Sequence, residues 1–402
     1  MNGPLGLSSA QCEAREWAKE FARRSIAPRA LELDDNPDSP ERDALLREAA
    51  AAGILGVSLP EVLGGSGMDQ ISGALVTEEL AAACSGCAVL FGATTLGMLP
   101  ILLSFDPGLI GRFVMPLVES WNTDEPKVAA LAATEPEMGS DFIMGHPTGR
   151  QGTRARKVDG GYELSGTKVF ISNGSLAEVV TVFARLDPPL TGVSNPVREN
   201  MVCLAVPADS PGFSVGQVFD KMGQRACPAA ELVFDEVFVP EENRVGAEGD
   251  GWKINRTVMS VTRSPVGAIA VGIARSAFEH ALTYAEARVQ GGSPIVGHQA
   301  TQLMLADMAI RVDAARHLVH EAVRAIELGQ PSLRLSSMAK TFASDAAVAN
   351  ALDAVQIMGG YGYMREYGVE KLLRDAKLTQ IYEGTNQINR FEIMESLAAE
   401  RA

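Results

Sequence analysis

The run YELSGTKVFIS at residues 162–172 alternates apolar and polar residues, which is the pattern of a strand with one buried face. Similar runs follow as VVTVFARL at 179–186, MVCLAVPA at 201–208 and AELVFDEVFVP at 230–240, and Gly, Pro, Asp and Asn separate them. Together these runs predict a β domain over residues 129–245.

Helical periodicity flanks this β domain on both sides. Residues 1–128 contain an alanine-rich segment whose apolar residues recur at intervals of three and four, and residues 246–402 return to that period. The clearest predicted apolar face consists of Leu303, Ala306, Ile310, Ala314, Leu318, Ala322 and Ile326. Because the strands form one block and do not alternate with helices, we expect an α+β protein with helical domains around a middle β domain.

The composition is that of a globular protein that can bury a large core. Apolar residues make up 46% and charged residues 21% of the 402 residues, which excludes collagen-like, disordered and disulfide-scaffold proteins. The net charge of −15 disfavours nucleic acid as a partner. The small number of cysteines, together with an N-terminal stretch in which Glu13 falls where a signal peptide would be most apolar, predicts a cytoplasmic location.

Residues 80–105 carry no charge and are numerous enough to raise the question of a membrane span. The glycines and the proline in this stretch argue against a span, so we expect two buried helices broken near them. Cys84 and Cys87 are interpreted as small core residues and not as a redox or zinc pair. His317 and His320 are expected on a hydrated helix face, and no metal site is predicted.

Glycine-punctuated polar segments carry the remaining chemistry, since the sequence lacks the motifs of Rossmann enzymes, P-loop NTPases, α/β-hydrolases and zincins. They read LAATEPEMGSD at 131–141, GTKVFISNG at 166–174, QIMGGYG at 356–362 and IYEGTNQINR at 381–390. Each alone is compatible with a turn. In this order, with HQ at 298–299 between them, they resemble the acyl-CoA dehydrogenases over essentially the whole chain.

The resemblance implies an N-terminal helical domain, a middle β-barrel or sheet domain and a C-terminal four-helix bundle. It also implies FAD as the cofactor and the dehydrogenation of a saturated acyl thioester to its trans-2-enoyl thioester. Glu383 takes the position of the base, where a water-poor pocket raises the pKa of a carboxyl group. The alternative for Glu383 is a helix cap. Some branches place the base just before an arginine, here Arg263, but Thr262 stands there and cannot serve.

Further site residues are implied by the same match. The residues expected to bind FAD are Leu131, Ala133, Thr134, Gly139, Ser140, Phe170, Ser172, Thr385 and Gln387. Those expected to hold the ADP part of an FAD from a neighbouring subunit are Arg288, Gln299, Gln356, Gly359 and Gly360. Contacts to substrate are implied for Ser140, Arg263, Tyr382 and Gly384. Phe170 is expected against the isoalloxazine ring, although taken alone it would be interpreted as a core residue.

The chain also departs from the family pattern. Gly291 stands where a phenylalanine is common, Glu137 and Met138 replace small residues, and residues 187–200 form a longer connection. The wall and floor of the acyl pocket are expected at Ala88, Phe91, Gly92, Thr95 and Leu96. Small residues in this set leave room, whereas its phenylalanine closes the pocket, so we favour a medium, branched or cyclic acyl group.

Several alternatives stay open at this point. The acyl group rides on coenzyme A or on a carrier protein, because both present the same thioester. A flavin monooxygenase or oxidase of the same fold is a competing enzyme, and a helical scaffold that has lost the flavin is a competing protein of another class. The resemblance further implies an electron-transferring flavoprotein as partner and a homo-oligomer, either a dimer or a tetramer.

Overall fold

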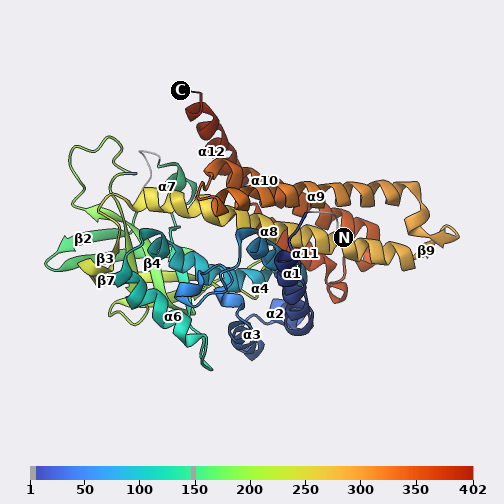
Figure 1. The fold of residues 1–402 in the computed structure, drawn as a ribbon, viewed down its shortest axis with the longest axis horizontal. Coiled ribbons are helices and arrows are strands. Elements are labelled where there is room, and N and C mark those ends of the chain that lie inside the picture. The colour runs from blue at the N-terminus through green and yellow to red at the C-terminus, as the bar shows by residue number, and fades with distance from the viewer. Residues whose placement is uncertain (1–5, 146–150, 402) are drawn as a thin grey trace.

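The computed structural model describes residues 6–145 and 151–401 and contains a helical N-terminal region, a β-sheet and a helical C-terminal region (Figure 1). The sheet lies at one end of the molecule, and the long C-terminal helices extend from it toward the other end. The first five residues of the stretch examined for a signal peptide lie outside the described residues. This arrangement is the α+β fold that the sequence predicts.

The N-terminal region is built from helices, several of which begin at side-chain caps. It contains α1 Ser9–Phe21, α2 Ala30–Asp35, α3 Pro40–Ala51, α4 Gln70–Ser104, α5 Pro107–Leu109 and α6 Met115–Ser120. Ser8 and Gln11 form a capping box at α1, and Ser39 caps α3. Asp69 caps α4 by accepting a hydrogen bond from the backbone N–H of Ser72. These polar side chains satisfy backbone donors that each helix leaves unpaired at its start.

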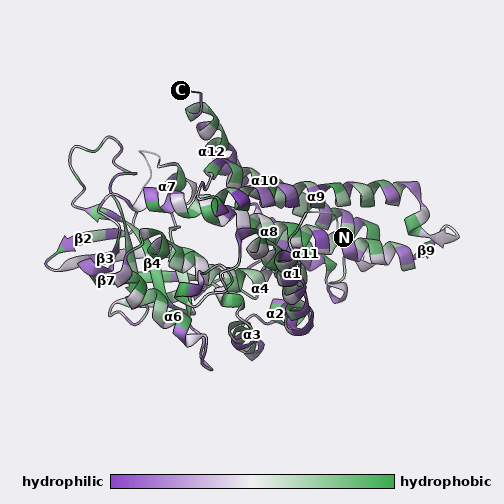
Figure 2. Cartoon of the chain, viewed as in Figure 1, coloured by the Kyte–Doolittle hydropathy of each residue, from purple (hydrophilic) through white to green (hydrophobic). Residues whose placement is uncertain are grey.

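One mixed sheet forms the middle region, and the four predicted runs become β3, β4, β5 and β7. The strands are β1 Val128–Ala132, β2 Arg154–Val158, β3 Gly161–Ser172, β4 Ala177–Asp187, β5 Met201–Pro207, β6 Phe213–Val218, β7 Ala229–Pro240 and β8 Arg244–Val245. Their order is β6-β7-β3-β2-β4-β5-β8, and β1 pairs parallel with β4. In Figure 2 the region of β4 is largely hydrophobic, whereas β2 at the end of the molecule and α1 on the outside are more hydrophilic.

Long helices make up the C-terminal region. They are α8 Gly251–Ala287, α9 Gln299–Glu327, α10 Leu333–Met358, α11 Val369–Thr379 and α12 Asn386–Ala399, and the short hairpin of β9 Val289–Gln290 and β10 Ser293–Pro294 joins α8 to α9. Helix α8 packs along α10 and α9 and also against α4, so it belongs to the core of both helical regions. At about 1.5 Å per residue, α8 is roughly 55 Å long and connects the sheet end of the molecule to the hairpin end.

Helix α4 has its predicted break near Gly86, one of the glycines of the stretch, and not near the later glycine and proline. It continues through Gly97 and Pro100, and its irregularity lies at Cys84, whose φ of −162° and ψ of 110° are not helical. Gly97 serves a different purpose, because a Cβ at this position would lie 2.5 Å from the backbone nitrogen of Ala130 in β1. Helices α4 and α8 are long and apolar enough to span a membrane, but 72% and 78% of their apolar windows are buried in protein. Such burial is typical of core helices.

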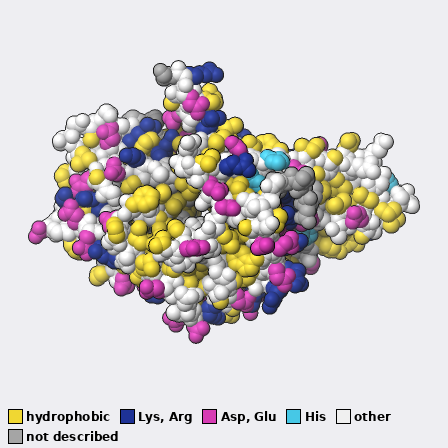
Figure 3. Space-filling model, in the orientation of Figure 1, with side chains coloured by type: hydrophobic (Ala, Val, Ile, Leu, Met, Phe, Trp, Pro, Cys, Tyr) yellow, Lys and Arg dark blue, Asp and Glu magenta, His cyan; other side chains and the backbone are white. Residues whose placement is uncertain are grey.

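The predicted apolar face of α9 is wrong in its first half, whereas Ala322 in its second half is buried as predicted. Leu303 and Ile310 are 69% and 65% exposed, whereas Leu305, Met308 and Val312 are buried. The helix carries two apolar stripes, and the spacing of its apolar residues alone does not show which stripe packs against α8 and α10. Figure 3 shows hydrophobic side chains gathered along the arm that α8 and α9 form.

His320 also differs from its expected place on a hydrated helix face, whereas His317 is exposed as predicted. His320 is only 7% exposed, and burial lowers its pKa to about 4. Helix α9 places His320 near the buried carboxylate of Glu78, which also forms ion pairs with arginines. The pattern of α9 alone does not reveal this partner. Among the described residues, no group of three or more His, Cys, Asp and Glu is placed to hold a metal ion.

A buried ion-pair cluster connects α4 to α8 and α9. Glu78 accepts two hydrogen bonds from Arg316, at 2.9 and 3.0 Å, and lies 2.9 Å from Arg275 Nε. Arg275 in turn donates to Glu79 at 2.7 Å. The side chains of Glu78, Arg275 and Arg316 are each only 7% exposed. The charges compensate one another in a place that water does not reach, so removing one leaves the others unpaired.

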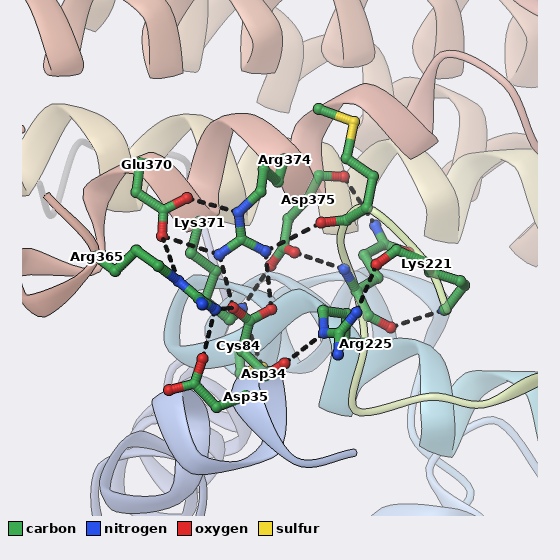
Figure 4. Close-up of polar contacts among 12 residues, drawn as sticks. Asp34, Asp35, Cys84, Lys221, Arg225, Arg365, Glu370, Lys371, Arg374 and Asp375 are labelled. Carbon is green, nitrogen blue, oxygen red and sulfur yellow. Dashed lines mark hydrogen bonds and ion pairs between the residues drawn. The ribbon is translucent and has the colours of Figure 1, made fainter. Parts of the chain in front are cut away.

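A second polar cluster, drawn in Figure 4, joins α2 and α4 to α11. Lys371 donates to Asp375 at 2.6 Å, and Asp375 also accepts from Ser85 Oγ at 2.8 Å and from the backbone N–H of Gln224 at 2.5 Å. The ammonium of Lys371 is 3.5 Å from the sulfur of Cys84. Cys84 and Cys87 are buried free thiols in this packing, as expected for core residues.

We expect Glu78→Gln to lower the free energy of unfolding by about 3 kcal/mol, because two buried arginines lose their shared counter-ion. The matched control is Glu321→Gln, which removes a carboxylate whose pair with Arg324 is about 60% exposed on both sides. The control is expected to change stability by less than about 0.5 kcal/mol. Urea unfolding followed by circular dichroism measures both, and equal losses in the two variants contradict the assignment of a structural role to the buried cluster.

Candidate active site

Glu383 lies in the turn between α11 and α12, and its backbone has an unusual conformation. Its φ is +55°, a left-handed value, and the following Gly384 has a φ of +84°. A residue with a side chain pays roughly 1–3 kcal/mol for such a conformation, so the surroundings must hold it there. Thr385 caps α12 by accepting from the backbone N–H of Ile388. Glu383 is therefore not the helix cap, and that alternative is wrong.

Buried cations hold the backbone of this turn. Arg263, from α8, donates from Nε to the carbonyl of Glu383 at 2.8 Å. Lys340, from α10, donates to the carbonyl of Gly384 at 2.8 Å, and Asn389 donates to the same oxygen at 2.7 Å. Arg263 and Lys340 are completely buried. The sequence match includes Arg263 but misses Lys340, which lies in an ordinary helical stretch with no motif to mark it.

The carboxyl group of Glu383 faces a hydrophobic cavity. Its Oε2 accepts a hydrogen bond from Thr262 Oγ1 at 2.7 Å. Burial raises the pKa of Glu383 above its ordinary value of 4.5, while the bond from Thr262 and the charges of Arg263 and Lys340 act in the opposite direction. A carboxyl group with a raised pKa is suited to accept a proton near neutral pH. Thr262, the residue that cannot itself be the base, instead orients Glu383.

The cavity beside Glu383 has a volume of about 280 Å³. Helix α4 contributes Ala88, Phe91, Gly92, Thr95 and Leu96, which are the residues predicted for the acyl pocket. Helix α8 contributes Thr262, Pro265 and Ile269, and the sheet contributes Ser172. Tyr382 lines the cavity as well, and its hydroxyl accepts from Gln224 Nε2 at 3.4 Å. The structure thus brings Ser172 to the adjacent residues Tyr382 and Glu383, which lie far from it in the sequence.

The loop after β1 contains the other predicted contacts of the middle region. Leu131 is in β1, Ala133 and Thr134 follow it, and Gly139 and Ser140 precede and begin the short helix α7 Ser140–Met144. Helix α7 lies beside the turn of Glu383, since a Cβ on Gly384 would be 3.2 Å from the side chain of Ile143.

A buried ion pair that the sequence match did not single out supports this loop. Lys168 donates to the carbonyl of Ala133 at 2.9 Å and to Glu135 at 2.8 Å. Glu135 also accepts from the backbone N–H groups of Gly152 and Thr153. Both residues stand inside the quoted motifs, Glu135 in TEPEMGSD and Lys168 in GTKVFISNG. A charged residue within an apolar strand run, as Lys168 is, is the signal that points to such a pair, because a buried charge rarely lacks a partner.

Phe170 is not a core residue. It is 63% exposed, its φ is +61°, and its ring lies 4.9 Å from the ring of Phe219. The pairing of β3 with β7 shifts register between Lys168 and Ile171, and a bulge of this kind turns a side chain away from its regular direction. Phe170 therefore presents an aromatic face near Ser172, where a flat ring system can stack.

The residues predicted for the ADP part lie far from Glu383. Arg288, Gly359 and Gly360 line a groove of about 490 Å³ at the hairpin end of α8. Gln299 and Gln356 are exposed and do not line it. Along α8, the distance from Arg263 to Arg288 is roughly 38 Å. The two groups of predicted flavin residues therefore occupy different parts of one chain.

Aromatic residues were missed at this groove. Tyr284 and Tyr361 line it, and the guanidinium of Arg288 lies 5.6 Å from the ring centre of Tyr361. Tyr361 belongs to the quoted QIMGGYG segment, so the aromatic after two glycines was an available signal. No atom lies within 4 Å of a Cβ placed on Gly359 or Gly360, so the groove leaves space beside the backbone there.

Two departures from the family pattern find an explanation. Gly291 and Gly292 have φ values of +62° and +87° and form the two-residue turn between β9 and β10, where side chains are disfavoured. The long connection over residues 187–200 reaches α7, since Arg198 donates to the carbonyl of Met144 at 2.8 Å. The guanidinium of Arg198 also lies 4.3 Å from the ring centre of Trp252.

These features fit FAD in the way the cofactor's chemistry requires. The exposed aromatic face of Phe170 and the nearby hydroxyl of Ser172 suit a flavin ring beside the cavity of Glu383. The groove with open glycine backbone and the cation of Arg288 suits a pyrophosphate. Thr385 and Gln387 lie at the start of α12, Gln387 with its side chain exposed.

The chain matches three domain families in order. These are the acyl-CoA dehydrogenase N-terminal domain over residues 8–118, the middle domain over 130–237 and the C-terminal domain over 249–398. A curated acyl-CoA dehydrogenase of Bacillus subtilis is 40% identical over 98% of this chain and 99% of its own length. Cyclohex-1-ene-1-carbonyl-CoA dehydrogenase of Syntrophus aciditrophicus is also 40% identical, over 97% of this chain and 90% of its own length.

Solved structures agree with these matches. Butyryl-CoA dehydrogenase from Megasphaera elsdenii superposes with a TM-score of 0.85 at 35% identity, covering 99% of this chain and 100% of its own. The FAD complex of PigA has a TM-score of 0.87 at 29% identity and covers 99% of both chains. The prolyl acyl carrier protein oxidase AnaB has a TM-score of 0.87 at 28% identity and covers 97% and 99%. The chain belongs to the acyl-CoA dehydrogenase family, whose members are flavin-dependent oxidoreductases.

Proposed function

We propose that this protein is an FAD-dependent acyl-CoA dehydrogenase in which Glu383 removes the α-proton of a saturated acyl thioester. The observation that carries the proposal is the carboxyl group of Glu383, held by Thr262 at the wall of a hydrophobic cavity, with its pKa raised by burial. The product is the trans-2-enoyl thioester. A helical scaffold without flavin chemistry is the less favoured alternative, because burying a carboxyl group at an apolar cavity costs free energy and brings such a scaffold no benefit.

The residues of the chain divide the work as follows. Glu383 receives the α-proton at a carboxylate oxygen, and Thr262 keeps that carboxylate directed into the cavity. Apolar walls from α4 and α8 exclude water, so the charge that develops on the substrate is not dispersed into solvent. FAD, when bound, accepts the β-hydrogen as a hydride. Of the thioester contacts expected from the sequence, Tyr382 lines the cavity, whereas Ser140, Gly384 and the fully buried Arg263 do not. We therefore propose Tyr382 as a thioester contact and propose that Arg263 acts by holding the carbonyl of Glu383.

The proposed substrate is a medium, branched or cyclic acyl group on coenzyme A. A cavity of about 280 Å³ is at the small end of ligand pockets, which span roughly 300–1,000 Å³. Phe91 fills part of the wall, while Gly92 opens it. The cyclohexene-carbonyl relative supports the cyclic choice. A carrier-protein thioester or oxygen chemistry, as the similarity to the carrier-protein oxidase suggests, is the second candidate, from a more distant structure.

Quaternary structure and partners complete the proposal. Exposed apolar side chains on α9, α10 and α12 include Leu303, Ile310, Phe342, Leu352 and Phe391, which suits burial against further copies of the chain. We propose a dimer or tetramer in which the Arg288 groove of one subunit holds the ADP part of its neighbour's FAD. An electron-transferring flavoprotein is the proposed acceptor of electrons. Free cysteines, four of the five of them buried, suit the proposed cytoplasmic location.

The substitution Glu383→Gln is expected to slow reduction of bound FAD by an acyl-CoA roughly 10²–10⁴-fold, because the amide cannot accept the α-proton. The flavin absorbance spectrum is expected to show that FAD remains bound. Anaerobic stopped-flow absorbance measures the rate, and Glu366→Gln, which changes an exposed carboxylate outside the cavity, is the matched control. Wild-type rates in the Glu383 variant contradict its role as the base.

The pH dependence of flavin reduction is a separate prediction. Reduction requires ionised Glu383, so the rate is expected to fall as pH decreases through a pKa that lies above 4.5. Thr262→Val removes the hydrogen bond that lowers this pKa, and the acid limb is expected to move to higher pH by up to about one unit. Rates measured across pH 5–9 in both proteins decide the matter. A limb that stays in place, or that moves to lower pH, rejects the orientation of Glu383 by Thr262.

A further inference from the structure

We infer that Lys340 is a positioning residue for Glu383, which secures the left-handed turn and keeps a positive charge beside the carboxylate. The inference rests on the proposed role of Glu383 as the base. Lys340 is on α10, and its ammonium reaches the turn with bonds of 2.8 Å to the carbonyl of Gly384 and 2.9 Å to Asn386 Oδ1. These two acceptors lie on either side of Thr385, so one cation ties the turn to the start of α12.

The partners of Lys340 set it apart from other buried lysines of the chain. Lys168 is paired with Glu135 at 2.8 Å, and Lys371 with Asp375 at 2.6 Å. Over the described residues, no carboxylate forms an ion pair with Lys340, and the carbonyl of Gly384 and the amide oxygen of Asn386 that accept from it are both neutral. A buried ammonium without a bonded carboxylate is expensive to maintain. The placement of Lys340 against the turn is therefore better explained by an effect of its charge on Glu383 than by a contribution to the stability of the fold.

The charges around Lys340 make Glu383 its natural counter-ion. Burial, the largest effect, lowers the pKa of Lys340 to about 7, Arg263 and Arg390 lower it too, and Glu383 and Asp345 raise it. Asp345 is bound to Arg390 at 2.7 Å, while Arg263 is bound to Glu392. The carboxylate of Glu383, by contrast, is bonded to a neutral hydroxyl.

This arrangement has a consequence for the base. The ammonium of Lys340 favours the ionised form of Glu383 and counteracts the effect of burial, so the carboxyl group is ionised at a lower pH than burial alone allows. The same ammonium fixes the carbonyl of Gly384 and thus the direction in which the preceding side chain projects. Lys340 is not among the residues that line the cavity. It acts through Glu383.

The test uses the holoenzyme with Lys340→Gln, which removes the charge but keeps an amide donor for the carbonyl of Gly384. The ionisation of Glu383 is followed through its carboxyl band in infrared difference spectra, with Glu383→Gln as the reference that identifies the band. We expect the midpoint in Lys340→Gln to rise by about one pH unit, and the acid limb of flavin reduction to move with it. Lys340→Met, which lacks both charge and donor, provides a second neutral variant in case the first is unstable.

Ser344→Ala is the matched control, because Ser344 accepts from Asn386 Nδ2 at 2.8 Å and supports the same turn without a charge. The control is expected to leave the Glu383 midpoint in place even if it slows turnover. An unchanged midpoint in the neutral Lys340 variants overturns the inference, and so does an equal shift in Ser344→Ala. Failure of the proposed function is distinguishable, because it leaves wild-type FAD unreduced by acyl-CoA whatever the infrared titration shows.

Discussion

The structure depends on the hydrogen bond from Arg263 to the carbonyl of Glu383 and on the bonds that Lys340 and Asn389 make to the next carbonyl. Without them, a glutamate at a φ of +55° has no reason to keep that conformation. The donors come from α8, α10 and α12, so three helices must be in register for the turn to exist. The C-terminal bundle is therefore the frame that aims one carboxyl group.

The removal of Glu383 from water depends on the rest of the fold as well as on the C-terminal bundle. The cavity beside Glu383 takes its walls from α4 in the N-terminal region, α8 in the C-terminal region and Ser172 at the end of β3. The buried cluster of Glu78, Arg275 and Arg316 joins α4 to α8 and α9. The cavity whose burial raises the pKa of Glu383 therefore exists only when all three regions pack together.

Much of this was predictable from local pattern. Alternation identified β3, β4, β5 and β7, and the family resemblance pointed to Glu383, Thr385 and the pocket residues of α4. The failures share a physical cause, which is that local pattern carries no information about distant partners. The two apolar stripes on α9 look equivalent in the sequence, and only packing against α8 and α10 distinguishes them. His320 is buried on the side of α9 that faces Glu78 of α4, a residue far away in the sequence. Lys340 is an unremarkable helical lysine until the turn of Gly384 folds over it.

The central claim is that the protein dehydrogenates an acyl-CoA through bound FAD. An anaerobic titration of the purified holoenzyme with a panel of saturated acyl-CoAs, followed by the visible absorbance of the flavin, tests it most directly. The account predicts bleaching with medium, branched or cyclic acyl groups and little with very long straight chains. A yellow protein that no acyl-CoA bleaches contradicts the claim and favours a carrier-protein thioester or oxygen chemistry on the same fold.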